Sequence, residues 1–165
     1  MKWDRSIRAA LAAACVALFG ASAQAGPTLD QIRARGTLVC GIHTGVAGFA
    51  LPDSRGTWQG FDVDLCRGLA VAIFNDITKV RFVPMSSSTR FTALGSGEID
   101  VLFRTSTQTM LRDTTLGLRH VTTYFFDGHG FLVRNALGVR QVREMNGATI
   151  CLIQGTTNEQ VTADY

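Results

Sequence analysis

Apolar positions in the first two thirds of the chain follow two different periods. Short apolar, β-rich runs that follow polar turns have the length of buried strands, and they lie at 37–43, 79–85 and 99–103. Residues 61–74 instead place Phe61, Leu65 and Leu69 at helical spacing, which predicts an amphipathic helix. A serine cap, a short apolar stretch and a glycine stop predict a second helix within 87–98. The order β-loop-α-β-α-β predicts an α/β fold with a largely parallel sheet and right-handed crossovers.

The same kinds of pattern continue in the last third of the chain. Further apolar runs lie at 120–126, 130–134 and 148–154, which predict two extended segments and another buried strand. Residues 142–147 predict a short helix, and a helix with Thr156 or Thr157 as its cap is predicted from residue 155 onward. A second βα pattern therefore begins near residue 135, although one strand and one helix cannot bury a core by themselves.

The first 25 residues have the three parts of a secretory signal. Lys2, Arg5 and Arg8 form a positive start, AALAAACVALFGA supplies an apolar run, and AQA is a small-x-small cleavage site ending at Ala25. The apolar run is short for a membrane span. We therefore expect cleavage after Ala25 and export, with an uncleaved amphipathic anchor as the alternative.

Composition agrees with an exported globular protein. The chain has 165 residues, of which 46% are hydrophobic, and its 16 basic and 13 acidic residues give a net charge of +3. No concentrated basic patch is present, so we do not predict a nucleic-acid partner. Three of the four cysteines, Cys40, Cys66 and Cys151, follow the predicted cleavage site. In an oxidising compartment this odd count leaves one thiol without an internal partner.

Hydroxyl side chains and an arginine follow the predicted strand at 99–103. They are Thr105, Ser106, Thr107, Thr109 and Arg112. In open parallel sheets, ligands bind beyond the carboxyl ends of the strands, where hydroxyls can donate to an anion and arginine matches the shape of a carboxylate. The alternative is a capping turn at the start of a helix, with Arg112 in solvent.

Two other turns have a comparable position. Gly155 and Thr157 directly follow the predicted strand at 148–154, where they either bind another part of the same anion or simply cap a helix. Phe61 lies beside a glycine turn, where it either walls a pocket or belongs to the core. Asp62 and Asp64 fall in the first turn of a predicted helix, so they suit the helix dipole better than catalysis.

Signals for metal or enzyme chemistry are weak. The three histidines, His43, His120 and His129, are scattered, and neither His-x-x-x-His nor Cys-x-x-Cys spacing occurs. The sequence also lacks a Gly-x-Ser-x-Gly elbow and a glycine-rich phosphate loop. We therefore predict no catalytic residue, no metal and no cofactor.

Taken in order, several segments resemble one protein family. The segments are LDQIRARGTLVCGIHTGVAGF, GTWQGFDVDLCRGLAVAIF, STRFTALGSGEIDVLFRTSTQTMLRD, FFDGHGFLVR and NGATICLIQGTTNE. They are similar to the periplasmic solute-binding proteins of polar amino-acid ABC importers, above all to the general L-amino-acid-binding branch. The resemblance runs from Leu29 to the last residue.

The resemblance implies a type II periplasmic binding protein with one complete first lobe and a truncated second lobe, because members of the family have roughly twice this length. The implied segments are a signal peptide at 1–25, a first α/β lobe at 26–128, a crossover or hinge strand at 129–135 and the start of the second lobe at 136–165. The implied partners are small-molecule L-amino acids and a membrane permease, and the implied state is a monomer.

By position in the family, Arg112 is expected to bind the α-carboxylate of the ligand. Thr105 and Thr107 would assist from the first lobe, Thr157 beside Gly155 would complete the contact from the second, and Phe61 would wall the side-chain pocket. Cys40 and Cys66 could form a disulfide, with buried thiols as the alternative. Two other functions remain open on this fold, a periplasmic enzyme similar to cyclohexadienyl dehydratase and the sensor domain of a signalling receptor.

Overall fold

The computed structural model describes residues 26–164 of the chain, which divides into two compact units at Arg35. In the first unit it describes one helix, α2 (Pro27–Arg35), with Pro27 in its first turn and Arg33 in its last. Both positions suit a helix, because proline fits the first turn and a cation is stabilised at the carboxyl end. The predicted signal peptide at 1–25 lies outside the described residues. Within 26–164, no helix is long and apolar enough to span a bilayer.

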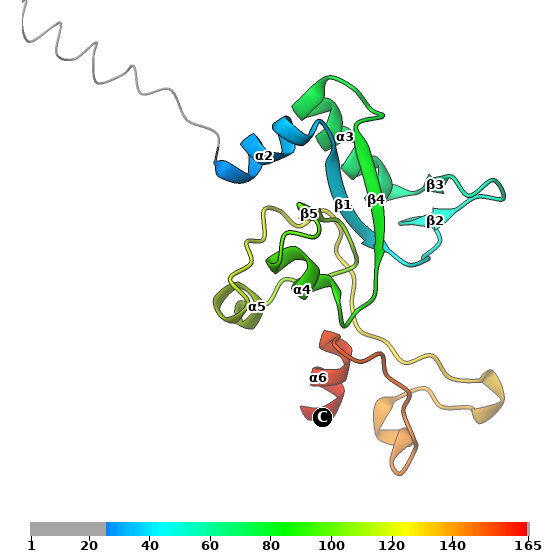
Figure 1. Ribbon diagram of the computed structural model, residues 1–165. Coiled ribbons are helices and arrows are strands. Elements are labelled where there is room, and N and C mark those ends of the chain that lie inside the picture. Colours follow the sequence, from blue (N-terminus) through cyan, green and yellow to red (C-terminus); the bar gives the residue numbers. More distant parts are fainter. Residues whose placement is uncertain (1–25, 165) are drawn as a thin grey trace, which may run out of the picture. The chain divides into compact units, whose positions relative to one another are not determined.

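A three-stranded parallel sheet organises the second unit (Figure 1). Its strands, in spatial order, are β4 (Val80–Met85), β1 (Leu38–His43) and β5 (Val101–Leu102). In the central strand, Cys40 lies opposite Phe82 on one side and Val101 on the other. The three strands fall within the runs predicted from the sequence, although the third is shorter than its apolar run.

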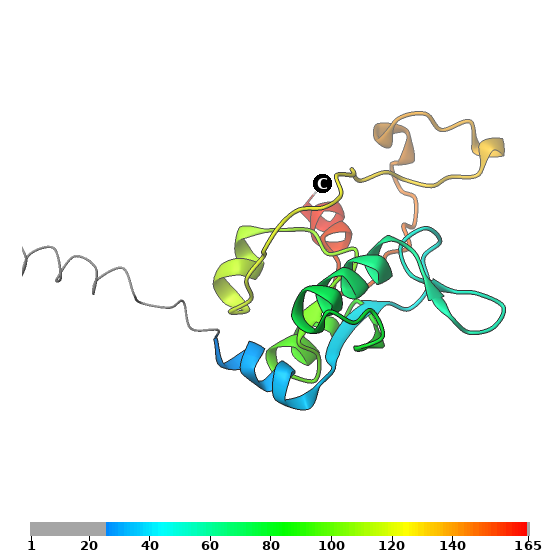
Figure 2. The same cartoon turned by 90° about the horizontal axis from the view of Figure 1, so that it is seen from above.

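Alternate residues of β1 point to two separate core clusters. Cys40 and Ile42 pack with Val63 of helix α3 (Phe61–Phe74), whereas Val39 packs with Ala93 of helix α4 (Arg90–Gly95). Because successive side chains of a strand face opposite ways, the two helices cover opposite faces of the sheet. Both helices were predicted, and Figure 2 shows α3 running along the sheet.

The loop between β1 and α3 forms a small hairpin. Its antiparallel strands are β2 (Leu51–Pro52) and β3 (Trp58–Gln59). Gly60 then begins α3 with a φ of 123°, and a Cβ atom there would lie 2.4 Å from the carbonyl oxygen of Phe49. Only glycine therefore fits this turn without a shift of the backbone.

The last third of the chain departs from its prediction. Its regular elements are α5 (Met110–Thr115), two 3₁₀ turns at Asn135–Leu137 and Val142–Met145, and α6 (Thr157–Asp164). The helix predicted from 155 is confirmed, and the one predicted at 142–147 is present as a 3₁₀ turn. The buried strand predicted at 148–154 does not form, and the extended segments predicted at 120–126 and 130–134 join no sheet among the described residues. An apolar run becomes a strand only when a neighbour satisfies its backbone groups, and no described segment pairs with these three runs.

Candidate functional site

A cavity of about 640 Å³ lies beyond the carboxyl ends of the three parallel strands. His43 ends β1, Ser87 follows β4 and Arg104 follows β5, and all three line the cavity. The remaining walls come from the loop after β5, from residues 120–129 and from residues 153–158. In open parallel sheets, this is the edge at which ligands usually bind.

Four of the six predicted site residues line this cavity: Thr105, Thr107, Arg112 and Thr157. Gly155 lines a smaller neighbouring cavity of about 240 Å³, together with Arg112 and Phe91. Phe61 is 42% exposed and lines neither cavity. Its ring meets the edge of Tyr124, which does line the larger one, with 5.6 Å between ring centroids.

For Arg112, the sequence left two interpretations open: a residue that binds an anion, or part of a capping turn with its side chain in solvent. The structure has features of both. Thr109 caps α5 and accepts a hydrogen bond from the backbone nitrogen of Arg112, so the capping turn exists. The side chain of Arg112, however, is not in solvent, because the residue is only 7% exposed. Its Nη1 donates to the carbonyl oxygen of Thr107 over 2.6 Å, and its guanidinium lies 4.9 Å from the centroid of the Phe91 ring.

Burial lowers the pKa of Arg112 through loss of solvation. The residue still keeps its charge at neutral pH, because a guanidinium is a very strong base. Among the described residues, none accepts from Nε or Nη2 of Arg112. The side chain is thus a fixed cation, next to a cavity, with donors available.

The two predicted binding turns meet at a pair of hydroxyls. Thr107 Oγ1 lies 3.1 Å from Thr157 Oγ1, although the residues are 50 positions apart. Thr156, and not Thr157, caps α6, because its hydroxyl accepts from the backbone nitrogen of Glu159. The side chain of Thr157 is therefore left free to face the cavity.

Gly155 supports this arrangement through its backbone. Its φ is 77°, which favours glycine, and a Cβ atom would lie 3.1 Å from the carbonyl oxygen of Ser87. The turn at Gly155 therefore packs closely against the turn that follows β4. A side chain at this position would push the two turns apart.

Sequence reasoning missed two further arginines of the cavity. Arg90 is 1% exposed and donates from Nε to Ser106 Oγ and from Nη2 to the carbonyl oxygen of Gly155, both over 3.1 Å. Its Nη1 donates to the carbonyl oxygen of Ser87. Loss of solvation, with the charges of Arg104 and Arg112, lowers the pKa of Arg90 to about 10.

Arg104 is 5% exposed and anchors the turn after β4. Its Nε donates to the carbonyl oxygen of Met85 over 3.0 Å, and its Nη2 donates to Ser87 Oγ over 2.9 Å. Burial lowers the pKa of Arg104, and the charge of Asp62 opposes that effect. In the sequence, Arg90 is only an arginine after a run of serines, and Arg104 is only an arginine directly after a strand. Both situations are common on protein surfaces.

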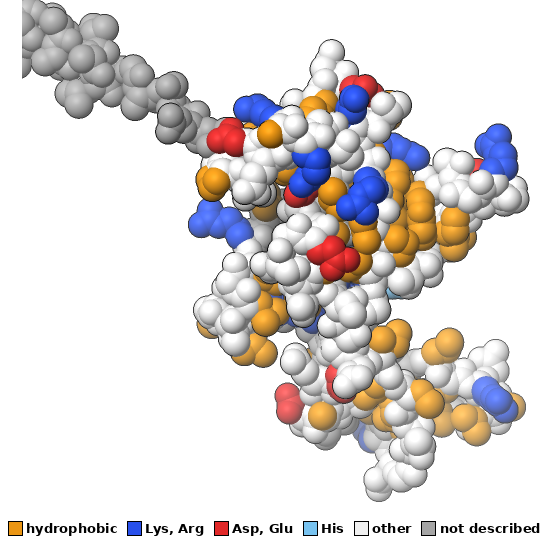
Figure 3. Space-filling view, in the orientation of Figure 1, with side chains coloured by type: hydrophobic (Ala, Val, Ile, Leu, Met, Phe, Trp, Pro, Cys, Tyr) orange, Lys and Arg blue, Asp and Glu red, His pale blue; other side chains and the backbone are white. Residues whose placement is uncertain are grey.

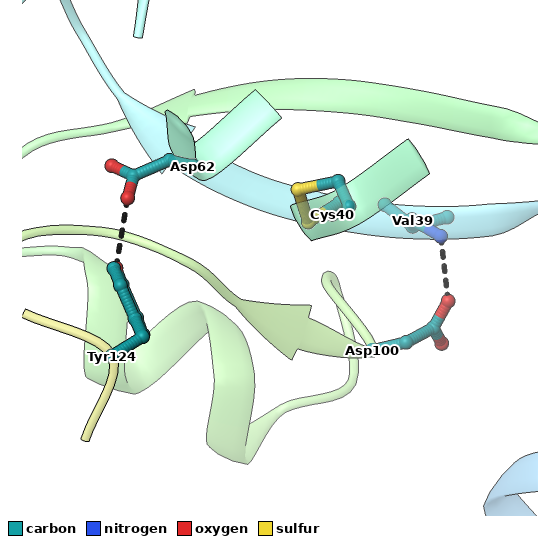
Figure 4. The surroundings of a disulfide bond; sticks show 6 residues. Val39, Cys40, Asp62, Asp100 and Tyr124 are labelled. Carbon is teal, nitrogen blue, oxygen red and sulfur yellow. Dashed lines mark hydrogen bonds between the residues drawn. A yellow bond between two sulfur atoms is a disulfide. The ribbon is translucent and has the colours of Figure 1, made fainter. Parts of the chain in front are cut away.

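Asp62 and Asp64 have different surroundings, although both lie in the first turn of α3. Asp64 is exposed and pairs with Arg67 over 2.9 Å, as expected for a surface carboxylate. Asp62 is fully buried, and its Oδ1 accepts a hydrogen bond of 2.8 Å from the hydroxyl of Tyr124 (Figure 4). Its Oδ2 has no partner among the described residues, and loss of solvation raises the pKa of Asp62.

A disulfide joins Cys40 of β1 to Cys66 of α3 within the core, close to the Asp62–Tyr124 contact (Figure 4). Cys151 is exposed and unpaired among the described residues. Residues 26–164 also contain no group of three or more histidine, cysteine, aspartate or glutamate side chains that could hold a metal ion.

The chain is similar to proteins of known family. Residues 38–158 match the family described as bacterial extracellular solute-binding proteins, family 3. A general L-amino acid-binding periplasmic protein of Rhizobium johnstonii is 48% identical over 162 residues, which are 98% of this chain and 47% of that protein. A glutamate/glutamine/aspartate/asparagine-binding protein of Rhodobacter capsulatus is 50% identical over 145 residues, which are 88% of this chain and 43% of that protein.

A solved structure is similar as well. An ABC transporter periplasmic binding protein from Brucella ovis, with glutathione bound, shares 48% sequence identity and gives a TM-score of 0.80. The match covers 86% of this chain and 44% of that one. The chain spans about half the length of the curated relatives it matches.

Proposed function

The chain belongs to the bacterial extracellular solute-binding proteins, family 3, and from this premise we propose that it binds L-amino acids outside the cytoplasm for delivery to an ABC importer. The observation that carries the proposal is the buried guanidinium of Arg112 at the wall of the cavity. The amino-acid-binding relatives named above support the choice of ligand.

The α-carboxylate of the ligand would lie against Arg112. Its Nη1 is held by the carbonyl oxygen of Thr107, which fixes the plane of the guanidinium, and its other donors have no described partner. A positioned, partly desolvated arginine can form two parallel hydrogen bonds to a carboxylate. The hydroxyls of Thr105, Thr107 and Thr157 line the same cavity and would donate to the remaining oxygen positions.

The size of the cavity also fits a small ligand. Its volume of about 640 Å³ falls within the range of roughly 300–1,000 Å³ that is usual for small-molecule sites. Phe49 and Tyr124 form part of an aromatic wall, so the side chain of the ligand would meet apolar surface. In this proposal Gly155 and Phe61 act indirectly, the first by close packing of its turn and the second by supporting Tyr124.

Export, delivery and domain boundaries belong to the same proposal. The leader at 1–25 would direct export and would be removed after Ala25. The mature protein would then act in the periplasm, and it would be a monomer. Residues 26–128 would form the first lobe, 129–135 the hinge and 136–165 the start of the second lobe. Closure about such a hinge would present the loaded protein to a membrane permease.

The replacement Arg112→Ala tests the proposal in the purified full chain. Losing one partner of a buried charge pair costs about 2–5 kcal/mol, so calorimetric affinity for L-amino acids should fall by at least an order of magnitude. Arg119→Ala is the matched control, because Arg119 is exposed and does not line the cavity. Equal affinity in the two variants, with circular dichroism showing both folded, would contradict the proposal.

We propose no catalytic step, in keeping with the relatives, which are named as binding proteins. An enzyme would change the bound molecule, whereas a carrier releases it intact. Mass spectrometry of the ligand after prolonged incubation with the protein should therefore recover the amino acid unaltered. A product that accumulates with time would support the enzyme alternative instead.

A further inference from the structure

One aromatic ring contacts two of the buried arginines of the site. Phe91 lies in the first turn of α4, and the centroid of its ring is 4.2 Å from Cζ of Arg90 and 4.9 Å from Cζ of Arg112. Both arginines are at most 7% exposed. Phe91 itself is half-buried and lines the smaller cavity together with Arg112. The ring therefore lies directly beside the guanidinium that is proposed to bind the ligand.

The ring takes the place that a carboxylate often has beside a buried arginine. Neither Arg90 nor Arg112 forms an ion pair with a described carboxylate. Glu159 lines the smaller cavity with Arg112, but the hydrogen bond described for its carboxylate comes from the backbone nitrogen of Gly155. The face of an aromatic ring carries partial negative charge and attracts a guanidinium, more strongly where both are withdrawn from water. Phe91 therefore offsets part of the cost of burying two neighbouring cations.

From these contacts we infer that Phe91 is a positioning residue for Arg112. Its ring holds the guanidinium in place, so that the donors not used by the carbonyl oxygen of Thr107 stay available to the α-carboxylate of the ligand. The inference rests on the proposed function, in which Arg112 binds that carboxylate. It adds that an aromatic side chain at position 91, and not merely an apolar one, sets how tightly the carboxylate is bound.

The two arginines beside the ring are held in different ways. The guanidinium of Arg90 donates to acceptors in three separate turns, namely Ser106 Oγ and the carbonyl oxygens of Ser87 and Gly155. The guanidinium of Arg112 has one described hydrogen bond, from Nη1 to the carbonyl oxygen of Thr107. A side chain held by a single hydrogen bond keeps rotational freedom, which contact with a ring reduces. Arg112 therefore depends on Phe91 for its orientation, whereas Arg90 does not.

NMR relaxation of the Arg112 side chain tests the inference without a ligand. In the purified full chain with isotope-labelled arginine, the Nε resonance is assigned through Arg112→Lys. The order parameter of its Nε–H bond should be that of a rigid group, about 0.85. Phe91→Leu keeps an apolar side chain but removes the ring, and the order parameter should fall below about 0.6. An unchanged order parameter would overturn the inference, whether or not the chain binds amino acids.

Phe82→Leu is the matched control, because it makes the same exchange at a ring beside another arginine. The centroid of the Phe82 ring is 5.6 Å from Cζ of Arg67, and Phe82 packs against the core and lines neither cavity. This replacement should lower stability through lost packing and leave the order parameter of Arg112 unchanged. An equal fall in both variants would assign the effect to general loosening of the sheet and contradict the inference.

Calorimetry with L-alanine measures the consequence for binding. Phe91→Leu should lower the affinity about tenfold, whereas Phe91→Tyr, which keeps the ring, should retain nearly the affinity of the unaltered chain. Phe82→Leu should leave the affinity unchanged. Equal losses in the leucine and tyrosine variants at position 91 would contradict the inference. If the unaltered chain binds no L-amino acid, the proposed function fails, and the order parameters still decide whether Phe91 holds Arg112.

A fluorinated ring separates electrostatic attraction from packing. Trifluorophenylalanine in place of Phe91 has nearly the same shape, but fluorine withdraws electrons and removes the negative charge of the ring face. In relaxation and in calorimetry, this protein should behave like Phe91→Leu, although the volume of the side chain is kept. Behaviour like that of the unaltered chain would mean that the ring acts through packing alone, and would overturn the inference that an aromatic face positions Arg112.

Discussion

Two regions of the molecule have similar apolar patterns and different structures. The sheet region (residues 36–116) buries Ile42 completely within a parallel sheet covered on both faces. In the extended region (residues 117–164), Leu132 is fully exposed and Ile153 is 68% exposed, and Figure 3 shows hydrophobic side chains at the surface of this part of the chain. An apolar run therefore specifies a strand only where a neighbouring strand can complete its hydrogen bonds.

The extended region nevertheless contributes to the candidate site. Tyr124 reaches Asp62, Phe125 meets the edge of Phe49, and Thr157 meets Thr107. These contacts are polar or aromatic and involve single side chains, unlike the continuous packing of the sheet region. The cavity therefore has one wall built on the packed sheet, and its other wall is held by a few specific contacts.

The two regions should differ most in how much stability is lost when an apolar side chain is truncated. Truncation of Ile42 to alanine removes buried methyl groups and should cost about 2–5 kcal/mol of unfolding free energy. The same change at Ile153 should cost no more than about 0.5 kcal/mol, because that side chain is exposed. Urea unfolding of both variants measures the difference, and similar costs would mean that the extended region has a packed core of its own.

The cysteines give the next contrast. The Cys40–Cys66 disulfide spans 26 residues of the sheet region, and replacing both cysteines by alanine should cost about 3 kcal/mol through the greater freedom of the unfolded chain. Replacing exposed Cys151 by alanine should leave thermal stability unchanged within error. A destabilised Cys151→Ala variant would show that this thiol has a structural partner.

The hydrogen bond between Tyr124 and Asp62 joins the two regions. Its loss should have a smaller effect on stability, and that effect should depend on pH. Tyr124→Phe leaves the Asp62 carboxylate without its hydrogen bond and should cost about 1–3 kcal/mol at neutral pH. The pKa of Asp62 is already raised by burial and should rise further in the variant, so protonation relieves more of the penalty there. The cost of the replacement should therefore shrink as the pH falls through the folded pKa of Asp62.

Asp62→Asn provides the matched background for this experiment, because asparagine cannot titrate. In that background the effect of Tyr124→Phe should not vary with pH. Thermal unfolding of the four proteins between pH 7 and pH 4.5 forms the double-mutant cycle. A pH dependence that persists in the asparagine background would assign the effect to another group.

Local sequence patterns were enough to predict the sheet region. The strand at 38–43 and the helix at 61–74 follow from apolar spacing, and the position of Arg112 beyond a strand end predicted its place at the cavity. The burial of Arg90 and Arg104 could not be predicted in this way, because it depends on turns that are distant in the sequence. The contact of Phe61 with Tyr124 could not be predicted for the same reason, since Tyr124 lies 63 positions further on.

Amidation of the ligand shows whether Arg112 binds the α-carboxylate. L-Alanine and L-alaninamide differ in the α-carboxylate, and their affinities can be measured for the unaltered chain and for Arg112→Ala. We predict that amidation costs about 2–5 kcal/mol in the unaltered chain and almost nothing in the variant, where the carboxylate has lost its partner. An equal cost of amidation in both proteins would contradict the claim.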